Sequence, residues 1–312
     1  MSAAPALPAL APAEDAGQFD TPAFVVHRAG DAPASPLVFA SPHSGRHYPL
    51  DMMAASLLDA SAIRLSEDAL VDELILGAVD HGATVITAAY ARAYIDVNRE
   101  PYELDASMFE DELPDFARGR SARVAAGLGS IARIVAEGHE IYARKLTFAE
   151  ASRRIEMVHQ PYHDALEDLL AQARARFGAA VLVDWHSMPA AAARTYGQSG
   201  DQGIGMSGAG VLDLVLGDRF GAACAPAITT LVERELEAMG YRVARNAPYA
   251  GGYTTEFYGQ PASHTHALQI EINRGLYLDE ATLEPREGFG RLKRNLEKVF
   301  AALGRGVRGG ME

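Results

Sequence analysis

The sequence predicts a single-domain α/β protein, a sheet covered by helices on both faces. Two observations lead to this fold class. Short apolar segments of strand length alternate along the chain with longer segments whose apolar residues recur at helical steps. That alternation is typical of a sheet between helical layers. The 312 residues also show no internal repeat and no convincing linker, so one domain is the economical interpretation.

The strand candidates are rich in β-branched and aromatic residues, which suits them to a buried sheet. We expect strands at residues 36–40 (PLVFA), 84–88 (TVITA), 93–97 (AYIDV), 180–183 (AVLV) and 266–272 (HALQIEI). Residues 240–245 (GYRVAR) are a weaker candidate.

Between these segments, apolar residues recur at three- and four-residue steps, the period of an amphipathic helix. Residues 68–81 (DALVDELILGAVDH) show the pattern and stop at Gly82. Residues 226–239 begin with Pro and are followed by Gly240, as a helix should. Further helices are expected at residues 129–147, 150–177 and 288–303, and Pro161 should break or kink the second of these.

The two ends of the chain differ from the domain between them. Residues 1–20 are rich in Ala and Pro, and no Lys or Arg precedes their apolar residues. They therefore resemble neither a signal peptide nor an anchor, and we expect a disordered arm. The domain should span residues 21–305, followed by a flexible tail at 306–312. No apolar run approaches the roughly 20 residues needed to span a bilayer, so the default location is the cytoplasm.

The composition of the chain limits the classes of partner that it is expected to bind. The formal net charge is −13, which argues against nucleic acid or an anionic membrane as the main partner. A small anionic substrate remains compatible, because a site can be locally basic. Cys224 is the single cysteine, which excludes an intrachain disulfide and fits a reducing compartment. We expect it to be a buried apolar residue. Nothing in the sequence indicates an oligomeric state.

Four strand candidates run into dense polar clusters. These clusters are SPHSGRHYP at 41–49, Asn98-Arg99, DWHSMP at 184–189, and Asn273-Arg274-Gly275. In open α/β sheets, ligands bind beyond the carboxyl ends of the strands. The four clusters together would supply histidines, carboxylates and arginines to one site.

His43 and His186 occupy matching positions after two of these strands. A single turn histidine is unremarkable, but two at matching strand ends favour a shared function. Two His, a carboxylate and a water form the usual catalytic zinc set. Asp68 and Glu67 both qualify for the carboxylate. The alternative is that they cap the following helix and complement its dipole.

Other polar residues could bind a substrate carboxylate or transfer a proton beside the expected metal site. Arg99 offers a rigid fork that matches a carboxylate, and Asn98 can add a donor. Arg99 could instead pair with Glu100 or Glu103. Glu271 lies within an apolar strand, where burial would raise its pKa and suit it as a general base.

Two motifs are false leads. Residues 203–208 match G-x-G-x-x-G, but the residues before them are loop-like, whereas a dinucleotide fingerprint needs a preceding strand. We expect a glycine-rich loop beside the active site instead. Ser44 and Ser187 have no G-x-S-x-G elbow around them, so the sequence does not indicate a serine hydrolase.

A set of longer motifs resembles one family. The segments SPHSGRHYP, SEDALVDEL, IDVNRE, VDWHSMP, DLVLGDRFG, NAPYAGGY and QIEINRGLYLDE occur in order between about Ser41 and Glu280. Together they resemble the N-formylglutamate amidohydrolases. The resemblance implies a fold like that of zinc carboxypeptidases and aspartoacylases, with a mixed, largely parallel sheet between helices. It also implies hydrolysis of N-formyl-L-glutamate to formate and L-glutamate, a step of histidine degradation.

The resemblance assigns roles residue by residue. His43 and His186 match the metal histidines, Asp68 is expected as the third ligand of a Zn²⁺ ion, and Glu271 matches the general base. Asn98 and Arg99 resemble the pair that holds a substrate carboxylate. One departure stands out: the related enzymes place a Glu ligand three residues after the first His, where this chain has Arg46.

The remaining site residues follow from the chemistry of this reaction. A developing oxyanion needs a cation, for which Arg46 and Arg219 are candidates. Arg219 or Arg274 could bind the second carboxylate of the substrate. Asn246 and Tyr249 could line the pocket. The alternatives are a related zinc carboxypeptidase or deacylase acting on another N-acyl amino acid, and a non-catalytic binding protein on a hydrolase fold.

Overall fold

The computed structural model describes residues 21–31, 33–135, 138–198 and 211–307. Three segments discussed above lie outside these ranges: the expected arm at 1–20, the glycine motif at 203–208, and residues 308–312 of the expected tail.

The described residues form one mixed seven-stranded sheet with the order β1-β3-β2-β4-β7-β5-β6. The strands are β1 Phe24–His27, β2 Leu37–Ser41, β3 Thr84–Ala88, β4 Ala180–Met188, β5 Leu214–Gly217, β6 Val243–Arg245 and β7 Thr265–Asn273. Strands β3, β2, β4 and β7 run parallel to one another, and β5 runs parallel to β6. Only the β1–β3 and β5–β7 pairs are antiparallel in this sheet. The prediction of a single α/β domain with a mixed, largely parallel sheet is confirmed.

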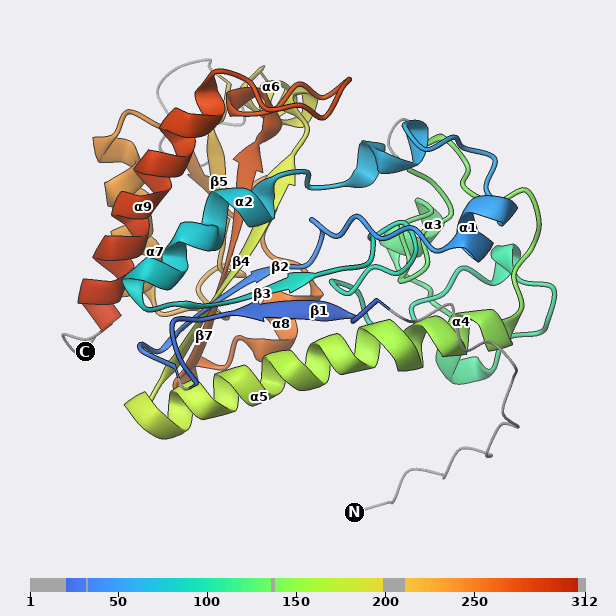
Figure 1. Ribbon diagram of the computed structural model, residues 1–312, viewed down its shortest axis with the longest axis horizontal. Coiled ribbons are helices and arrows are strands. Elements are labelled where there is room, and N and C mark those ends of the chain that lie inside the picture. Colours follow the sequence, from blue (N-terminus) through green and yellow to red (C-terminus); the bar gives the residue numbers. More distant parts are fainter. Residues whose placement is uncertain (1–20, 32, 136–137, 199–210, 308–312) are drawn as a thin grey trace.

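Helices cover both faces of this sheet (Figure 1). On one face lie α2 Val71–Ile75, α7 Pro226–Ala238 and α9 Gly288–Gly306, and on the other lies α5 Gln160–Phe177. The other helices of the described ranges are α1 Leu50–Ala55, α3 Ala122–Ala125, α4 Phe148–Arg154, α6 Ala190–Gln198 and α8 Tyr253–Tyr258. Side chains alternate along each strand, so Phe39 packs with α2, α7 and α9, while Val38 packs with α5. The central strands are therefore buried on both sides, which explains their continuous apolar runs.

Two predicted elements are wrong. Residues 93–97 form a turn, because their apolar side chains pack in a small cluster beside the sheet, where Arg154 stacks over the Tyr94 ring. The described residues of the helix expected at 129–147, which are 129–135 and 138–147, form irregular structure with isolated bridges. Gly129 lies against the Glu103 carbonyl, and Gly138 has φ +78, so neither favours a helix. The sequence also missed strands β1 and β5.

Other elements form with altered boundaries. The helix expected at 68–81 begins only at Val71, because Leu70 adopts a left-handed φ of 65°, and its second half is a 3₁₀-helix that ends before Gly82. The helix expected at 150–177 runs without a break from Phe148 to Phe177. A π-helical turn at Ile155–His159 ends two residues before Pro161, and its wider hydrogen-bonding pattern accommodates a residue without an N–H.

Within the described ranges, no helix combines the length and the apolar character that crossing a membrane requires.

Candidate metal centre and active-site pocket

The carboxyl ends of three neighbouring strands carry the central residues of the site. His43 follows β2 by two residues, His186 lies in β4, and Glu271 lies in β7 directly opposite His186. Asp68 reaches the same place because its backbone N–H donates to the His43 carbonyl at 3.0 Å. Parallel register therefore brings residues that are far apart in sequence to one edge of the sheet, as the strand-end argument predicted.

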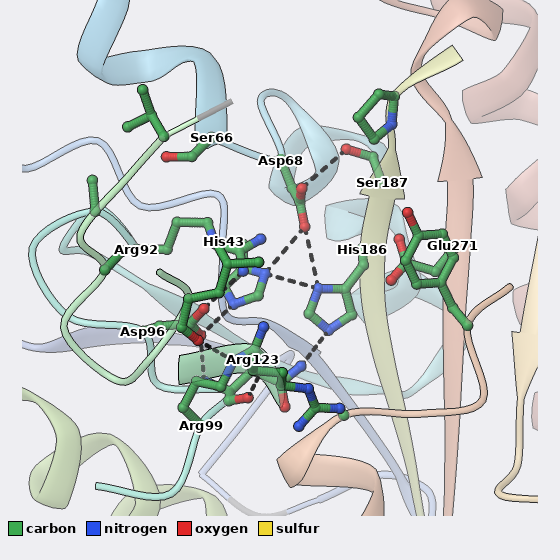
Figure 2. A pocket seen from close by; sticks show the side chains of 18 of the residues that line it. His43, Ser66, Asp68, Arg92, Asp96, Arg99, Arg123, His186, Ser187 and Glu271 are labelled. Carbon is green, nitrogen blue, oxygen red and sulfur yellow. Dashed lines mark hydrogen bonds and ion pairs between the residues drawn. The ribbon is translucent and has the colours of Figure 1, made fainter. Parts of the chain in front are cut away.

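His43, Asp68 and His186 form a compact, buried set of possible metal ligands (Figure 2). The Nδ1 atoms of the two histidines lie 3.0 Å apart. Asp68 Oδ2 lies 3.3 Å from His43 Nδ1 and 3.2 Å from His186 Nδ1. Donors at this spacing can each reach one ion at the roughly 2.0–2.2 Å typical of zinc ligands, so the residues fit the metal that the family resemblance implied.

Carboxylates fix the orientation of both imidazoles. His43 Nε2 lies 2.7 Å from Asp96 Oδ1, and His186 Nε2 lies 3.0 Å from Asp184 Oδ2. Because a carboxylate accepts the Nε2 proton, each Nδ1 keeps a lone pair directed at the cluster, the arrangement found behind metal-bound histidines. Sequence reasoning missed Asp96, which it placed within a strand.

Arg274 holds the third member of the set. Its Nη2 donates to Asp68 Oδ1 at 2.9 Å, and its Nε donates to Ser187 Oγ at 3.0 Å. Burial opposes the charge on Asp68, but the two neighbouring imidazoles and the charge of Arg274 hold its pKa well below the usual range. The Arg274 guanidinium is thus engaged by Asp68 rather than free for a substrate carboxylate.

The alternative third ligand, Glu67, lies elsewhere. Its side chain is fully buried and accepts hydrogen bonds from Arg64 Nε at 2.9 Å and Tyr48 Oη at 2.8 Å. Adjacent residues on this turn point in different directions, and only Asp68 reaches the two histidines.

Glu271 stands beside the cluster with an altered acidity. Burial raises its pKa to about 7, with the Asp68 charge adding to that rise and the Arg92 and Arg274 charges opposing it. Its Oε1 accepts a hydrogen bond from Gln269 Nε2 at 2.9 Å. A carboxyl group of this pKa can both accept and release a proton near neutral pH.

The three possible metal ligands, Glu271 and Arg274 open onto a cavity of about 620 Å³. Tyr249 and Asn98 also line it, as do four arginines: Arg92, Arg99, Arg123 and Arg274. The Asn98 amide is engaged structurally, because its Oδ1 accepts from the Thr254 backbone N–H at 2.8 Å. The negatively charged chain therefore concentrates positive charge at this cavity, which suits an anionic ligand. Arg92 and Arg123 were not expected from the sequence.

Three residues proposed for the site lie away from the cavity lining. Arg46 pairs with Asp72 at 2.8 Å, and Arg219 pairs with Glu256 at 3.1 Å. Asn246 donates to Asp218 Oδ1 at 2.8 Å and accepts from two backbone N–H groups of the same turn. Their expected contact with the reacting groups is therefore corrected: Arg46 and Arg219 are held by carboxylates outside the cavity, and Asn246 supports the turn after β5.

The fold and the site together define an α/β enzyme of the hydrolase class. Comparison with known proteins identifies the family within this class. Residues 35–278 match the family model described as N-formylglutamate amidohydrolase, and the chain belongs to this family. It is an amidohydrolase.

Individual relatives agree along most of the chain. The N-formylglutamate deformylase of Pseudomonas putida is 29% identical over 248 residues, which cover 78% of this chain and 82% of the relative. The solved N-formylglutamate amidohydrolase of Ralstonia eutropha JMP134 is 38% identical, with a TM-score of 0.83 that covers 93% of this chain and all of that one. The Agrobacterium tumefaciens gene product Atu2144, at 16% identity and a TM-score of 0.58, shares the fold.

Proposed function

We propose that this amidohydrolase hydrolyses N-formyl-L-glutamate to formate and L-glutamate, as a step of histidine degradation. The His43–Asp68–His186 set carries the proposal, because its three donor atoms converge as ligands of a divalent ion do, with Zn²⁺ the ion that best matches this donor set. The names of two relatives, which cover 78% and 93% of the chain, support the substrate. The cavity of about 620 Å³ is ample for a small N-acyl amino acid, and its arginines suit the substrate's carboxylates.

The proposed reaction adds water across the formyl C–N bond. When bound, the metal ion supplies a Lewis acid that polarises a carbonyl group and acidifies water. Glu271 accepts the proton from the attacking water as the new C–O bond forms, and it returns a proton to the amide nitrogen as the C–N bond breaks. Asp96 and Asp184 hold the two imidazoles, and Arg274 holds Asp68, so the site needs little rearrangement during the reaction.

The proposed activity is tested by measuring formate or amine release from N-formyl-L-glutamate, N-acetyl-L-aspartate and a short formyl-free peptide. We expect turnover of the first substrate, its loss on chelation, and its recovery with zinc. Full activity in metal-free protein would refute the metal, and turnover of only N-acetyl-L-aspartate or the peptide would refute the substrate.

The ligand set is tested by measuring bound metal in His186→Ala. Removing one of three ligands should release most of the metal, because two donors hold an ion far more weakly than three. His139→Ala is the matched control, since His139 is exposed and does not line the cavity. Equal metal content in the two variants would contradict the assignment of His186.

A further inference from the structure

Two of the four arginines that line the cavity form ion pairs with buried carboxylates, and the other two form none with the described residues. Arg274 Nη2 lies 2.9 Å from Asp68 Oδ1, and Arg92 Nη2 lies 2.7 Å from Asp96 Oδ2. Both carboxylates already belong to the metal centre, directly or through His43. The charges of Arg274 and Arg92 are therefore largely neutralised within the protein, and they serve the geometry of the ligands.

Arg99 and Arg123 lack such partners among the described residues. The guanidinium of Arg99 donates only to backbone carbonyls, to Leu128 from Nε at 3.1 Å and to Asn98 from Nη1 at 2.8 Å. The guanidinium of Arg123 has neither a hydrogen bond nor an ion pair with any residue in the described ranges, and it lines the cavity from the exposed helix α3. No carboxylate of the described residues therefore neutralises these two cations, which could bind a ligand.

The chain holds the two arginines close to each other. Leu128 bridges them, because its carbonyl accepts from Arg99 Nε while its N–H donates to the Arg123 carbonyl at 2.8 Å. Ser121 caps the start of α3 by accepting from the Val124 N–H at 3.2 Å. Figure 2 shows both side chains on the same side of the cavity.

In the protein without substrate, the positive charges of Arg99 and Arg123 repel each other. Burial lowers the pKa of Arg99, and although Asp96 opposes this, the positive charges of Arg92 and Arg123 lower the pKa further. A carboxylate placed between Arg99 and Arg123 would offset that repulsion and satisfy their free N–H groups. A cavity that keeps two such cations beside a hydrolytic centre is suited to a substrate with a second carboxylate.

We propose that Arg123 is a specificity residue of the proposed reaction: with Arg99 it binds the side-chain carboxylate of the substrate and so selects N-acyl derivatives of dicarboxylic amino acids. This inference rests on the proposed function for the identity of the reacting group. Its position at the exposed rim places Arg123 where the distal end of an extended substrate arrives once the amide is at the buried metal ligands.

The test compares N-formyl-L-glutamate with N-formyl-L-glutamine, which has the same shape and a neutral side chain. A hydrogen-bonded charge pair contributes about 1.5–3 kcal/mol, or roughly 10- to 100-fold in kcat/KM. Arg123→Gln should lose that factor for N-formyl-L-glutamate and change kcat/KM for N-formyl-L-glutamine by less than about threefold. Arg123→Lys should restore part of the preference.

Arg120→Gln is the matched control, because Arg120 is exposed on the same segment and absent from the cavity lining, and its substitution changes the net charge equally. It should leave the preference unchanged. Equal losses for both substrates in Arg123→Gln would show a structural role and overturn the proposal, as would an unchanged preference.

Calorimetric binding separates failure of this inference from failure of the proposed function. If the wild-type protein releases no formate, the proposed function fails, but the subsite is still tested by titrating glutarate against its monoamide. The wild-type protein should bind glutarate more tightly, and Arg123→Gln should lose that difference. Equal wild-type affinities for the two compounds would overturn the inference.

Discussion

The two histidines of the cluster direct Nδ1 inward because each has a carboxylate at Nε2. Contacts of single atoms thus decide which nitrogen of each histidine can bind a metal. Glu271 shows the same dependence: a carboxyl group in water would be ionised well below neutrality, but in this buried position its pKa is raised to about 7.

Glu271→Gln should retain bound metal and lose about 10²–10⁴-fold in turnover, the range typical of a lost acid–base group. Formate release and metal content measured on the same preparation give both results. Glu256→Gln is the control, because Glu256 is an exposed carboxylate outside the cavity. Turnover near that of the wild type would reject Glu271 as the base.

The pH profile provides a second test of Glu271. The base must be deprotonated, so kcat/KM should fall on the acidic side of a pKa at or below about 7, since a bound cation favours the charged carboxylate further. Glu271→Gln should lack this acidic limb. An identical limb in the variant would show that another group titrates there.

The segment from Phe148 to Phe177 shows how one helical element supports the site. Its π-helical turn ends at His159, and the ring of His159 stacks on that of His163, with centroids 4.4 Å apart. His159 Nε2 donates to the Arg99 carbonyl at 2.9 Å, and His163 Nε2 donates to the Val97 carbonyl at 2.7 Å. The helix thereby fixes the backbone on either side of Asn98, which lines the cavity.

The start of this element depends on a capping box. Thr147 Oγ1 accepts from the Glu150 N–H at 3.2 Å, and Glu150 Oε2 accepts from the Thr147 N–H at 2.7 Å. Thr147→Ala should lower the free energy of unfolding by about 1 kcal/mol, whereas Thr147→Ser should keep the cap. Urea unfolding measures both, and equal stabilities of the two variants would contradict the role of the cap.

In the whole molecule, the sheet lies between two apolar layers. The site lies at the carboxyl ends of the central strands. Trp185 is fully buried between Phe39 of β2 and Phe300 of α9, with ring centroids 5.6 and 5.7 Å away. The single tryptophan of the chain therefore reports on the packing between the sheet and the C-terminal helix.

The stability of the molecule should fall in mild acid partly because of His163. Burial, with the nearby His159, lowers its pKa to about 3, whereas the unfolded value is about 6.5. Below pH 6.5 the unfolded chain therefore binds a proton that the folded chain does not, so the contribution is lost as the pH falls. At pH 5 the loss is at most about 2 kcal/mol.

Urea unfolding of His163→Gln at pH 7 and pH 5, followed by Trp185 fluorescence, tests this contribution. The decrease in stability between the two pH values should be smaller in the variant than in the wild-type protein. His139→Gln, which alters an exposed histidine, should behave as the wild type does. An unchanged decrease in His163→Gln would refute the prediction.

The sequence could predict those features that depend on residue type over a short window. Buried parallel strands need continuous apolar runs, so β3, most of β2 and β7, and the first half of β4 were predictable. The polar residues at or after the ends of these runs indicated His43, His186 and Glu271. Residues 129–147 misled the same reasoning, because apolar spacing produced by packing of an irregular segment resembles that of a helix.

Only the tertiary structure showed which way side chains point and which residues they contact. Asp68 rather than Glu67 faces the histidines because of how the turn before α2 is folded. Arg219 and Asn246 both have positive φ, a backbone conformation that residue type does not reveal, and neither lines the cavity. The composition indicated that a −13 chain would need local cations to bind the proposed anionic substrate. Only the folded chain showed which of the cavity arginines form ion pairs with carboxylates of the described residues. The physical reason is that charge balance depends on distances of a few ångströms between residues far apart in sequence.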